Sequence, residues 1–236
     1  MDPLKERIRN WHAGRILDVA TGTGGFLKSL ADSFGNFTEG VGVDPAVDRI
    51  ETAGKAADKR LRFEVMDAEE LAFADRFFDT VVMRHSLHHL RHADRVLGEM
   101  VRVLKKDGLM IIGEVIQEAA TDRPNSERHL HHWWGRVDRT RGVPHFETLT
   151  REEVMALTRP LRLAGEEVLE FYEETTKEEQ TEALSDMLRH SEEVIRKLRE
   201  AGDQPELLAQ GEKLVDLFRS QGCADEKVLY VLGRKG

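Results

Sequence analysis

The stretch Arg15-Ile-Leu-Asp-Val-Ala-Thr-Gly-Thr-Gly-Gly-Phe26 decides the fold of this chain. Residues 15–19 form an apolar run with one carboxylate, Asp18, near its end, which predicts a buried strand. Small residues follow from Ala20 to Gly25, and the apolar positions after them recur at helical spacing. Doubly wound α/β folds bind nucleotide-like ligands at such a strand, tight turn and helix start.

The residues of this turn favour a cationic ligand over a dinucleotide. A dinucleotide-binding turn has the pattern G-x-G-x-x-G/A, in which the third small residue lets helix and strand pack closely. Counting from Gly22, that position is occupied by Leu27. A carboxylate at Asp18 would also repel a pyrophosphate and attract an ammonium or sulfonium group. An NAD-dependent oxidoreductase is therefore disfavoured.

The rest of the chain continues the alternation of strands and helices. Apolar runs predict further strands at 39–43, 61–66, 77–84, 108–115, 161–171 and 227–232, and helices at 24–34, 46–57 and 92–104. A βαβ order implies a parallel sheet with right-handed crossovers. Two amphipathic stripes, Leu184 to Leu198 and Leu207 to Phe218, predict a helical insertion at 172–226, before the last strand.

Two further carboxylates follow predicted strands. Asp44 ends the run 39–43, where an acidic side chain can accept hydrogen bonds from ribose hydroxyls. Its alternative role is a helix N-cap with Pro45 at the first helical position. Asp67, followed by Ala68, ends the third strand. Because the carboxyl ends of parallel strands share one edge of the sheet, we expect these groups beside the glycine turn.

The order and form of these motifs resemble the class I S-adenosylmethionine-dependent methyltransferases, in particular their type 11 branch. Ala20 replaces the first glycine of the common motif, as it does in the ubiquinone/menaquinone C-methyltransferases. The resemblance extends over about residues 12–117 and rests on four segments: Asp18–Gly24, Val41–Pro45, Asp67–Ala68, and Arg84–Leu90 together with Arg102–Gly113. It implies a Rossmann-like seven-stranded sheet, S-adenosylmethionine as cofactor and S-adenosylhomocysteine as product.

The resemblance also implies a cofactor site. The glycines admit the cofactor close to the backbone, Asp18 attracts the methionyl ammonium, Asp44 binds the ribose, and Asp67 with Ala68 holds the adenine. The predicted cofactor-binding residues are Asp18, Ala20, Gly22, Thr23, Gly24, Asp44, Asp67, Ala68 and Arg84.

The segment 116–147 is rich in His, Arg and Trp and follows the fifth strand, so it is expected to roof the acceptor site. Trp133 and Trp134 would supply apolar walls. Arg136 and Arg139 would hold an anionic group, because guanidinium binds such groups in a bidentate manner. Where the acceptor must lose a proton, His85 or His145 is the candidate general base.

The histidines raise the alternative of a metal site. Eight of the ten histidines lie between His85 and His145, and His85, His88, His89 and His92 would share one face of a helix. Imidazole is a zinc ligand, but zinc sites of the finger type need cysteines or regular spacing, which this region lacks. We predict no metal.

Charge and composition bound the partners and the compartment. The net charge is −9, and residues 166–200 carry 12 Asp/Glu against 5 Lys/Arg, so the chain offers no broad basic face for nucleic acid. No apolar run reaches the length of a membrane span, and the first residues lack the apolar region of a secretory signal. With Cys223 as the one cysteine, we expect a cytoplasmic protein.

Taken together, the sequence predicts a single methyltransferase domain over 1–236, with a substrate roof at 116–147 and the insertion 172–226 as a lid or a homodimer arm. The predicted activity is transfer of a methyl group to a small-molecule acceptor by in-line displacement. Two alternatives stay open: a non-catalytic cofactor-binding or regulatory module of the same fold, and an RNA methyltransferase. The fold does not name the acceptor.

Overall fold

The computed structural model describes residues 3–34, 36–55, 58–117, 125–142, 145–172, 177–224 and 226–236. The chain folds into two compact units. We call Met1–Glu114, Arg151–Phe171 and Val228–Gly236 the sheet unit, and Val115–Thr150 with Tyr172–Lys227 the helical unit.

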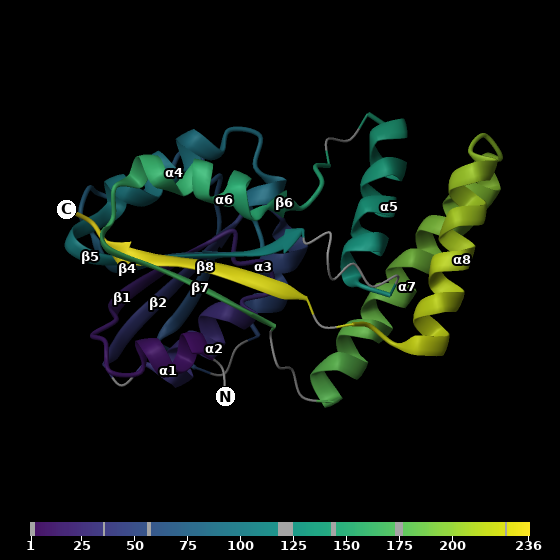
Figure 1. The fold of residues 1–236 in the computed structure, drawn as a ribbon. Helices are drawn as coiled ribbons and strands as arrows, with labels where there is room; N and C mark the ends of the chain where they lie inside the picture. The colour runs from purple at the N-terminus through teal and green to yellow at the C-terminus, as the bar shows by residue number, and fades with distance from the viewer. Residues whose placement is uncertain are drawn as a thin grey trace. The chain divides into compact units, whose positions relative to one another are not determined.

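A twisted sheet runs through the sheet unit (Figure 1). Its strand order is β3-β2-β1-β4-β5-β8-β7, and the first five of these strands pair in parallel. The order places the glycine-turn strand β1 between β2 and β4, so the chain moves outward from β1 to β2 and β3 and then crosses to β4 on the other side of β1. The predicted doubly wound α/β architecture with seven strands is confirmed. The strands are β1 (Gly14–Val19), β2 (Phe37–Asp44), β3 (Leu61–Val65), β4 (Phe78–Arg84), β5 (Leu104–Gln117), β7 (Ala164–Tyr172) and β8 (Lys227–Arg234). A two-residue strand, β6 (Leu149–Thr150), pairs with the end of β5.

The last strand, β8, has the opposite direction to its neighbour β5. Near the start of β5, the amide of Asp107 donates to the carbonyl of Lys235, just beyond the end of β8. Further along β5, Gly113 lies against the ring of Tyr230. Residue numbers increase along β5 from 107 to 113, while those of the neighbouring residues decrease from 235 to 230. Strand β8 is therefore antiparallel to β5.

Helices cover both faces of this sheet. In Figure 1, α4 and α6 lie on one face, and α1 and α2 lie on the other. Helix α4 covers the sheet because one of its faces is apolar. The buried residues on this face recur at helical spacing: Val96, Leu97, Met100 and Val103. The helices and short 3-10 turns are α1 (Pro3–Ile8), α2 (Gly25–Ser33), α3 (Val47–Ala53), η1 (Leu87–His89), α4 (Ala93–Val103), α6 (Arg151–Thr158) and η3 (Arg159–Leu161).

The helical unit has its own apolar core. Helices α5 (Glu127–Thr140), α7 (Lys177–Ala201) and α8 (Pro205–Gln221) pack around it, and Trp133, Leu198 and Phe218 are among its most buried side chains. Gly211 allows a close approach, because a Cβ there would lie 2.1 Å from the Trp133 ring. Helices α7 and α8 confirm the two helices predicted within the insertion.

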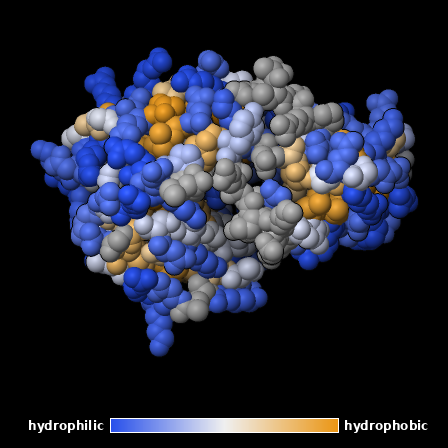
Figure 2. All heavy atoms as spheres, turned by 60° about the horizontal axis from the view of Figure 1, so that its bottom comes forward, coloured by the Kyte–Doolittle hydropathy of each residue, from blue (hydrophilic) through white to orange (hydrophobic). Residues whose placement is uncertain are grey.

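Hydrophilic residues predominate on the face drawn in Figure 2. In the described part of the chain, no helix combines the length and the apolar character needed to cross a bilayer.

Candidate functional site

The turn after β1 adopts the backbone that its small residues allow. Ala20, Gly22 and Gly24 have φ of 57°, 55° and 79°, a region that glycine enters without strain. Gly24 is also tightly packed, since a Cβ there would lie 2.6 Å from the Phe63 ring. Gly22 is different: the nearest described atom to its would-be Cβ, on Arg49, is 3.9 Å away. The backbone at Gly22 is therefore approachable by a ligand.

Asp18 is buried at the carboxyl end of β1, with 1% of its surface exposed. Burial raises the pKa of its carboxyl group to about 7, although the Thr21 hydroxyl and the charge of Arg84 act in the opposite direction. Thr21 Oγ1 donates to Asp18 Oδ2 at 2.6 Å. Near neutral pH this group is therefore close to half protonated, not the fully ionised carboxylate expected from the sequence.

Asp44 joins two parts of the site. Its Oδ2 accepts the Gly22 amide at 3.0 Å and its Oδ1 accepts the Ala46 amide at 2.9 Å, so the carboxylate ties the end of β2 to the glycine turn. A carboxylate has about four lone-pair sites, so further acceptance remains open to it. Helix α3 begins at Val47 with Ala46 as its N-cap, so the placement of Pro45 at the first helical position was wrong.

A pocket of about 510 Å³ opens in the sheet unit where β1 to β4 end. Its volume lies within the range of small-molecule sites. Of the predicted cofactor residues, the lining includes Ala20, Asp44, Asp67 and Ala68, and it also includes the predicted base His85. The remaining lining residues, which sequence reasoning missed, are Pro45, Ala46, Arg49, Glu69, Ser86, His89, Leu90, Arg91 and Val96.

Five predicted cofactor residues lie outside this lining. Asp18 and Gly24 are buried behind the turn, while Gly22, Thr23 and Arg84 are at least partly exposed. Arg84 ends β4, and its guanidinium lies over the ring of Phe26, 5.3 Å from the centroid. Its charge also acts on Asp18. These residues therefore contribute to the backbone of the turn and to its electrostatic potential, and not to the lining of the pocket.

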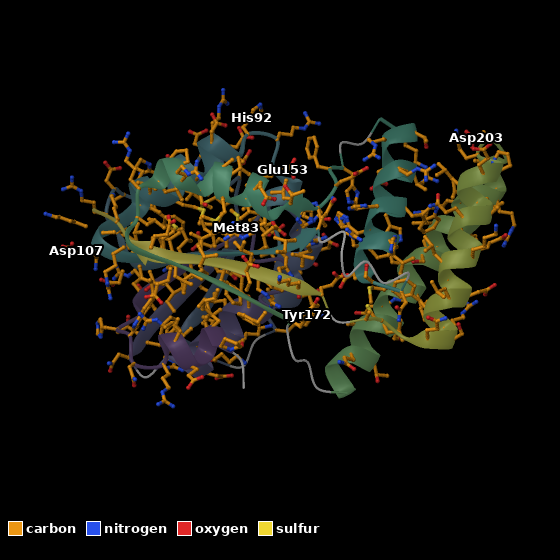
Figure 3. All side chains as sticks on the ribbon, in the orientation of Figure 1. Met83, His92, Asp107, Glu153, Tyr172 and Asp203 are labelled. Carbon is orange, nitrogen blue, oxygen red and sulfur yellow. The ribbon has the colours of Figure 1, made fainter. Side chains whose placement is uncertain are left out.

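The third strand contributes a polar turn. Asp67 Oδ1 accepts the Glu69 amide at 2.9 Å, which fixes the turn that brings the buried Ala68 to the pocket. Glu69 is held in turn by His92 at 2.8 Å and by Arg95 at 3.4 Å. Figure 3 shows His92 at the surface, whereas Met83 of β4 lies within the sheet unit and Asp107 at the far end of its sheet.

His85 is a neutral side chain at physiological pH. Burial lowers the pKa of its imidazole well below the usual value, and the charges of Arg84 and His88 act in the same direction. The backbone takes φ of 51° here, and its amide donates to the Gly113 carbonyl at 2.8 Å. His85 is thus fixed at the junction of β4 and β5, among the residues that line the pocket.

The four histidines after β4 do not share a helix face. Only Leu87–His89 is helical, as a 3-10 turn, and α4 begins at Ala93. His88 is buried beside Glu114, while His92 is exposed beside Glu69. The helical arrangement considered from the sequence was therefore wrong, because the chain turns sharply at His85.

The predicted substrate residues of 116–147 all lie in the helical unit. Trp133 is fully buried in its core, and Nε1 donates to the Leu207 carbonyl at 2.8 Å. This position corrects the expectation that its ring walls a substrate. Trp134 is half-buried, and its Nε1 donates to Ser191 Oγ at 3.2 Å.

The polar residues of this segment interact with one another. Arg136 donates to Gln210 at 2.7 Å, and Arg139 donates to the His145 carbonyl at 2.8 Å. His145 contacts Asp138 through Nδ1 at 2.8 Å and His131 through Nε2 at 3.2 Å. Residues 118–124 and 143–144, which complete the predicted roof, lie outside the described residues.

The chain is similar in sequence to known proteins. The family described as "Methyltransferase domain", type 11, matches residues 17–112. The chain is 29% identical to the sterol 4-C-methyltransferase strm-1 of Caenorhabditis elegans over 158 residues, which are 65% of this chain and 46% of that protein. It is 32% identical to the ubiquinone/menaquinone biosynthesis C-methyltransferase UbiE of Geotalea daltonii over 134 residues, 55% of each. The chain spans about half the length of the curated relatives it matches.

Solved structures share the fold. The YcgJ protein of Bacillus subtilis aligns with a TM-score of 0.58 at 20% identity, over 98% of this chain and 96% of that one. The geranyl diphosphate C-methyltransferase of Streptomyces coelicolor, solved with Mg²⁺, geranyl diphosphate and S-adenosyl-L-homocysteine, aligns with a TM-score of 0.57 at 15% identity, over 99% and 78% of the two chains. At these identities, the similarity establishes the fold.

Proposed function

Residues 17–112 belong to the type 11 methyltransferase domain family, and we propose that the chain transfers a methyl group from S-adenosylmethionine to a small-molecule acceptor. The observation that carries the proposal is the pocket at the carboxyl ends of β1 to β4, with the buried Asp44 joining it to the glycine turn. Open α/β sheets bind their ligands at this edge, where the strand order reverses.

The residues of the pocket fit this cofactor. Asp44 accepts the ribose hydroxyls, and Asp67 with Ala68 holds the adenine against the apolar Leu90 and Val96. The open backbone at Gly22 and the carboxyl of Asp18 serve the methionine end, where an ammonium group favours the ionised form of Asp18. When bound, S-adenosylmethionine supplies a methyl group on a sulfonium, and S-adenosylhomocysteine is the product. The chain's own part is to orient the reactants and exclude water.

Proton removal depends on the acceptor. His85 lies on the pocket wall in its neutral form, so it can accept a proton, although its lowered pKa makes it a weak base. His145 is the second candidate, and its contact with Asp138 is the kind that orients an imidazole for proton transfer. We also propose that three residues of the helical unit contact the substrate: Trp134, Arg136 and Arg139. The helices of 172–226 are proposed to act as a lid or a dimer arm.

The names of the relatives define the first acceptors to screen. Those names mention a sterol, ubiquinone/menaquinone biosynthesis and geranyl diphosphate, so small molecules of these kinds are the acceptors to screen first. An RNA acceptor is not favoured, because the net charge of −9 opposes a polyanion.

Calorimetry with S-adenosylmethionine and S-adenosylhomocysteine tests the cofactor assignment. We expect wild-type protein to bind at about micromolar concentration, and Asp44→Ala to bind at least about tenfold more weakly because it loses an acceptor for the ribose and for Gly22. Glu51→Ala, an exposed change on α3 away from the lining, is the control and should bind like wild type. Absence of binding by the wild type would falsify the proposal.

A further inference from the structure

A buried contact between Glu114 and His88 lies next to the pocket-lining residues in the chain. Glu114 of β5 is 0% exposed and His88 of the turn η1 is 5% exposed, and the Nδ1 of His88 lies 2.8 Å from Glu114 Oε1. The backbone amide of His88 also donates to Glu114 Oε2 at 3.4 Å. Each oxygen of one carboxylate therefore contacts the same residue, once through its side chain and once through its backbone.

The turn that this contact holds is the one that forms the pocket wall. Ser86, His89, Leu90 and Arg91 line the pocket, and His88 lies among them in sequence without lining it. The His88 ring lies against the His89 ring, with centroids 4.1 Å apart. A shift of His88 would thus move residues on the wall.

Burial makes the contact difficult to replace. Removing a carboxylate from water is unfavourable unless hydrogen bonds compensate, and breaking a buried pair on one side leaves the other group uncompensated. The position of Glu114 is itself rigid, because the preceding residue, Gly113, pairs with Arg84 in the sheet and accepts the amide of His85. Glu114 thus connects the rigid end of β5 to a short turn that has little regular structure of its own.

We propose that Glu114 is a positioning residue that, through the His88 side chain and amide, holds the turn Ser86–Arg91 in the conformation that binds the cofactor. This inference rests on the proposed function, because it takes the pocket to be the cofactor site. The role is to meet both hydrogen-bonding groups of His88. A glutamine can also fulfil it, because its oxygen can accept the His88 amide while its NH₂ donates to Nδ1 in the imidazole tautomer that carries its proton on Nε2.

Three variants separate this role from general stability. Glu114→Leu fills a similar volume without an acceptor, Glu114→Gln keeps an amide oxygen, and Thr80→Val is the matched control. Thr80 is fully buried near the start of β4 and donates to the Ala13 carbonyl at 2.9 Å, so its loss removes a buried hydrogen bond at the opposite end of the strand from the pocket.

Binding of S-adenosylhomocysteine by calorimetry is the first readout. We expect Glu114→Leu to weaken binding about tenfold or more, while Glu114→Gln stays within about threefold of wild type and Thr80→Val binds like wild type despite a lower melting temperature. Wild-type affinity in Glu114→Leu overturns the proposal, and so does a Glu114→Gln variant as weak as Glu114→Leu, since that result would assign the effect to charge.

Hydrogen exchange of the Ser86–Arg91 amides is the second readout and needs no ligand. Exchange should accelerate in Glu114→Leu and recover in Glu114→Gln. If wild-type protein binds no cofactor, the proposed function fails, and the exchange data still decide whether Glu114 holds the turn. If Glu114→Leu does not fold, the double variant Glu114→Leu/His88→Phe makes both partners apolar at similar volume, and the same weakened binding is expected of it.

Discussion

Asp18 and Asp44 lie at adjacent strand ends but differ in their burial and their hydrogen-bond partners. Both are buried, Asp18 more deeply, with 1% of its surface exposed against 6% for Asp44. The Asp44 carboxylate accepts two backbone amides, whereas the Asp18 carboxyl group accepts the Thr21 hydroxyl and the Leu27 amide. Burial therefore dominates at Asp18 and raises its pKa to about 7. Sequence alone placed both carboxylates correctly at the edge of the sheet, but the protonation state of Asp18 depends on burial, which the motif does not contain.

With Asp18 proposed to bind the ammonium group of the cofactor, we expect its raised pKa to make cofactor binding depend on pH. A cationic ligand prefers ionised Asp18, so its affinity should fall as the pH drops through about 7. Asp18→Asn should bind more weakly at pH 8 and lose most of this pH dependence. Calorimetry between pH 6 and pH 8 measures it, and an equal pH dependence in wild type and Asp18→Asn would show that another group titrates.

The same group affects stability in the opposite direction. Its folded pKa of about 7 lies above the usual pKa of 3.8 for aspartate, so the folded protein holds a proton that the unfolded chain releases between these values. The contribution of Asp18 to stability is present at low pH and is lost as the pH rises through this window, by about 1.4 kcal/mol per pH unit. Relative to Asp18→Asn, wild-type protein should therefore become less stable from about pH 4 to pH 7. Urea unfolding of both proteins across this range tests the sign, and a difference that grows in favour of wild type contradicts it.

At the scale of the element, the turn after β1 combines two neighbouring glycines with different requirements. Gly24 has φ of 79° and little space for a side chain beside Phe63. Gly25 opens α2, and a Cβ there would meet no described atom within 4 Å. The motif records both as glycine, but only the structure shows which one the fold needs.

Alanine substitutions should separate these glycines. Gly24→Ala combines backbone strain with a clash and should cost about 2–4 kcal/mol of folding free energy. Gly25→Ala should change it by less than about 1 kcal/mol and in the stabilising direction, because alanine favours the helix. Chemical denaturation of the two variants gives both values, and equal losses would contradict the packing at Gly24.

Other elements show where local patterns were sufficient and where they were not. The strands and α4 were predictable because each carries a regular apolar period, as at Val96, Met100 and Val103. Helix α5 was missed, although Leu130, Trp133 and Val137 are its buried positions, because histidine and arginine separate them and weaken the apolar signal. The additional pocket residues, such as Arg49 and His89, depend on how turns from four strands meet, and no single segment records that.

At the scale of the whole molecule, two segments predicted separately form one unit. The roof segment and the helical insertion both belong to the helical unit, where α5 packs with α7 and α8 around a common core. Trp133 connects α5 to α8, because its ring packs against Gly211 and its indole N–H donates to the carbonyl of Leu207, both in α8. Trp133 was predicted to wall the substrate site because its segment follows the fifth strand, but in the structure its ring is buried in the core of the helical unit.

Trp133→Ala should therefore affect the helical unit and leave the proposed cofactor pocket of the sheet unit intact. Removal of a fully buried tryptophan costs about 3–5 kcal/mol, because it loses apolar contact and leaves a cavity. Hydrogen exchange resolved by segment should show faster exchange in α5, α7 and α8, with unchanged exchange in β1, β2 and β4 and unchanged affinity for S-adenosylhomocysteine. Arg136→Ala, an exposed change in the same helix, is the control and should leave both readouts near wild type. Retained protection in all three helices of Trp133→Ala would contradict the core role, because that core cannot lose its largest side chain without local opening.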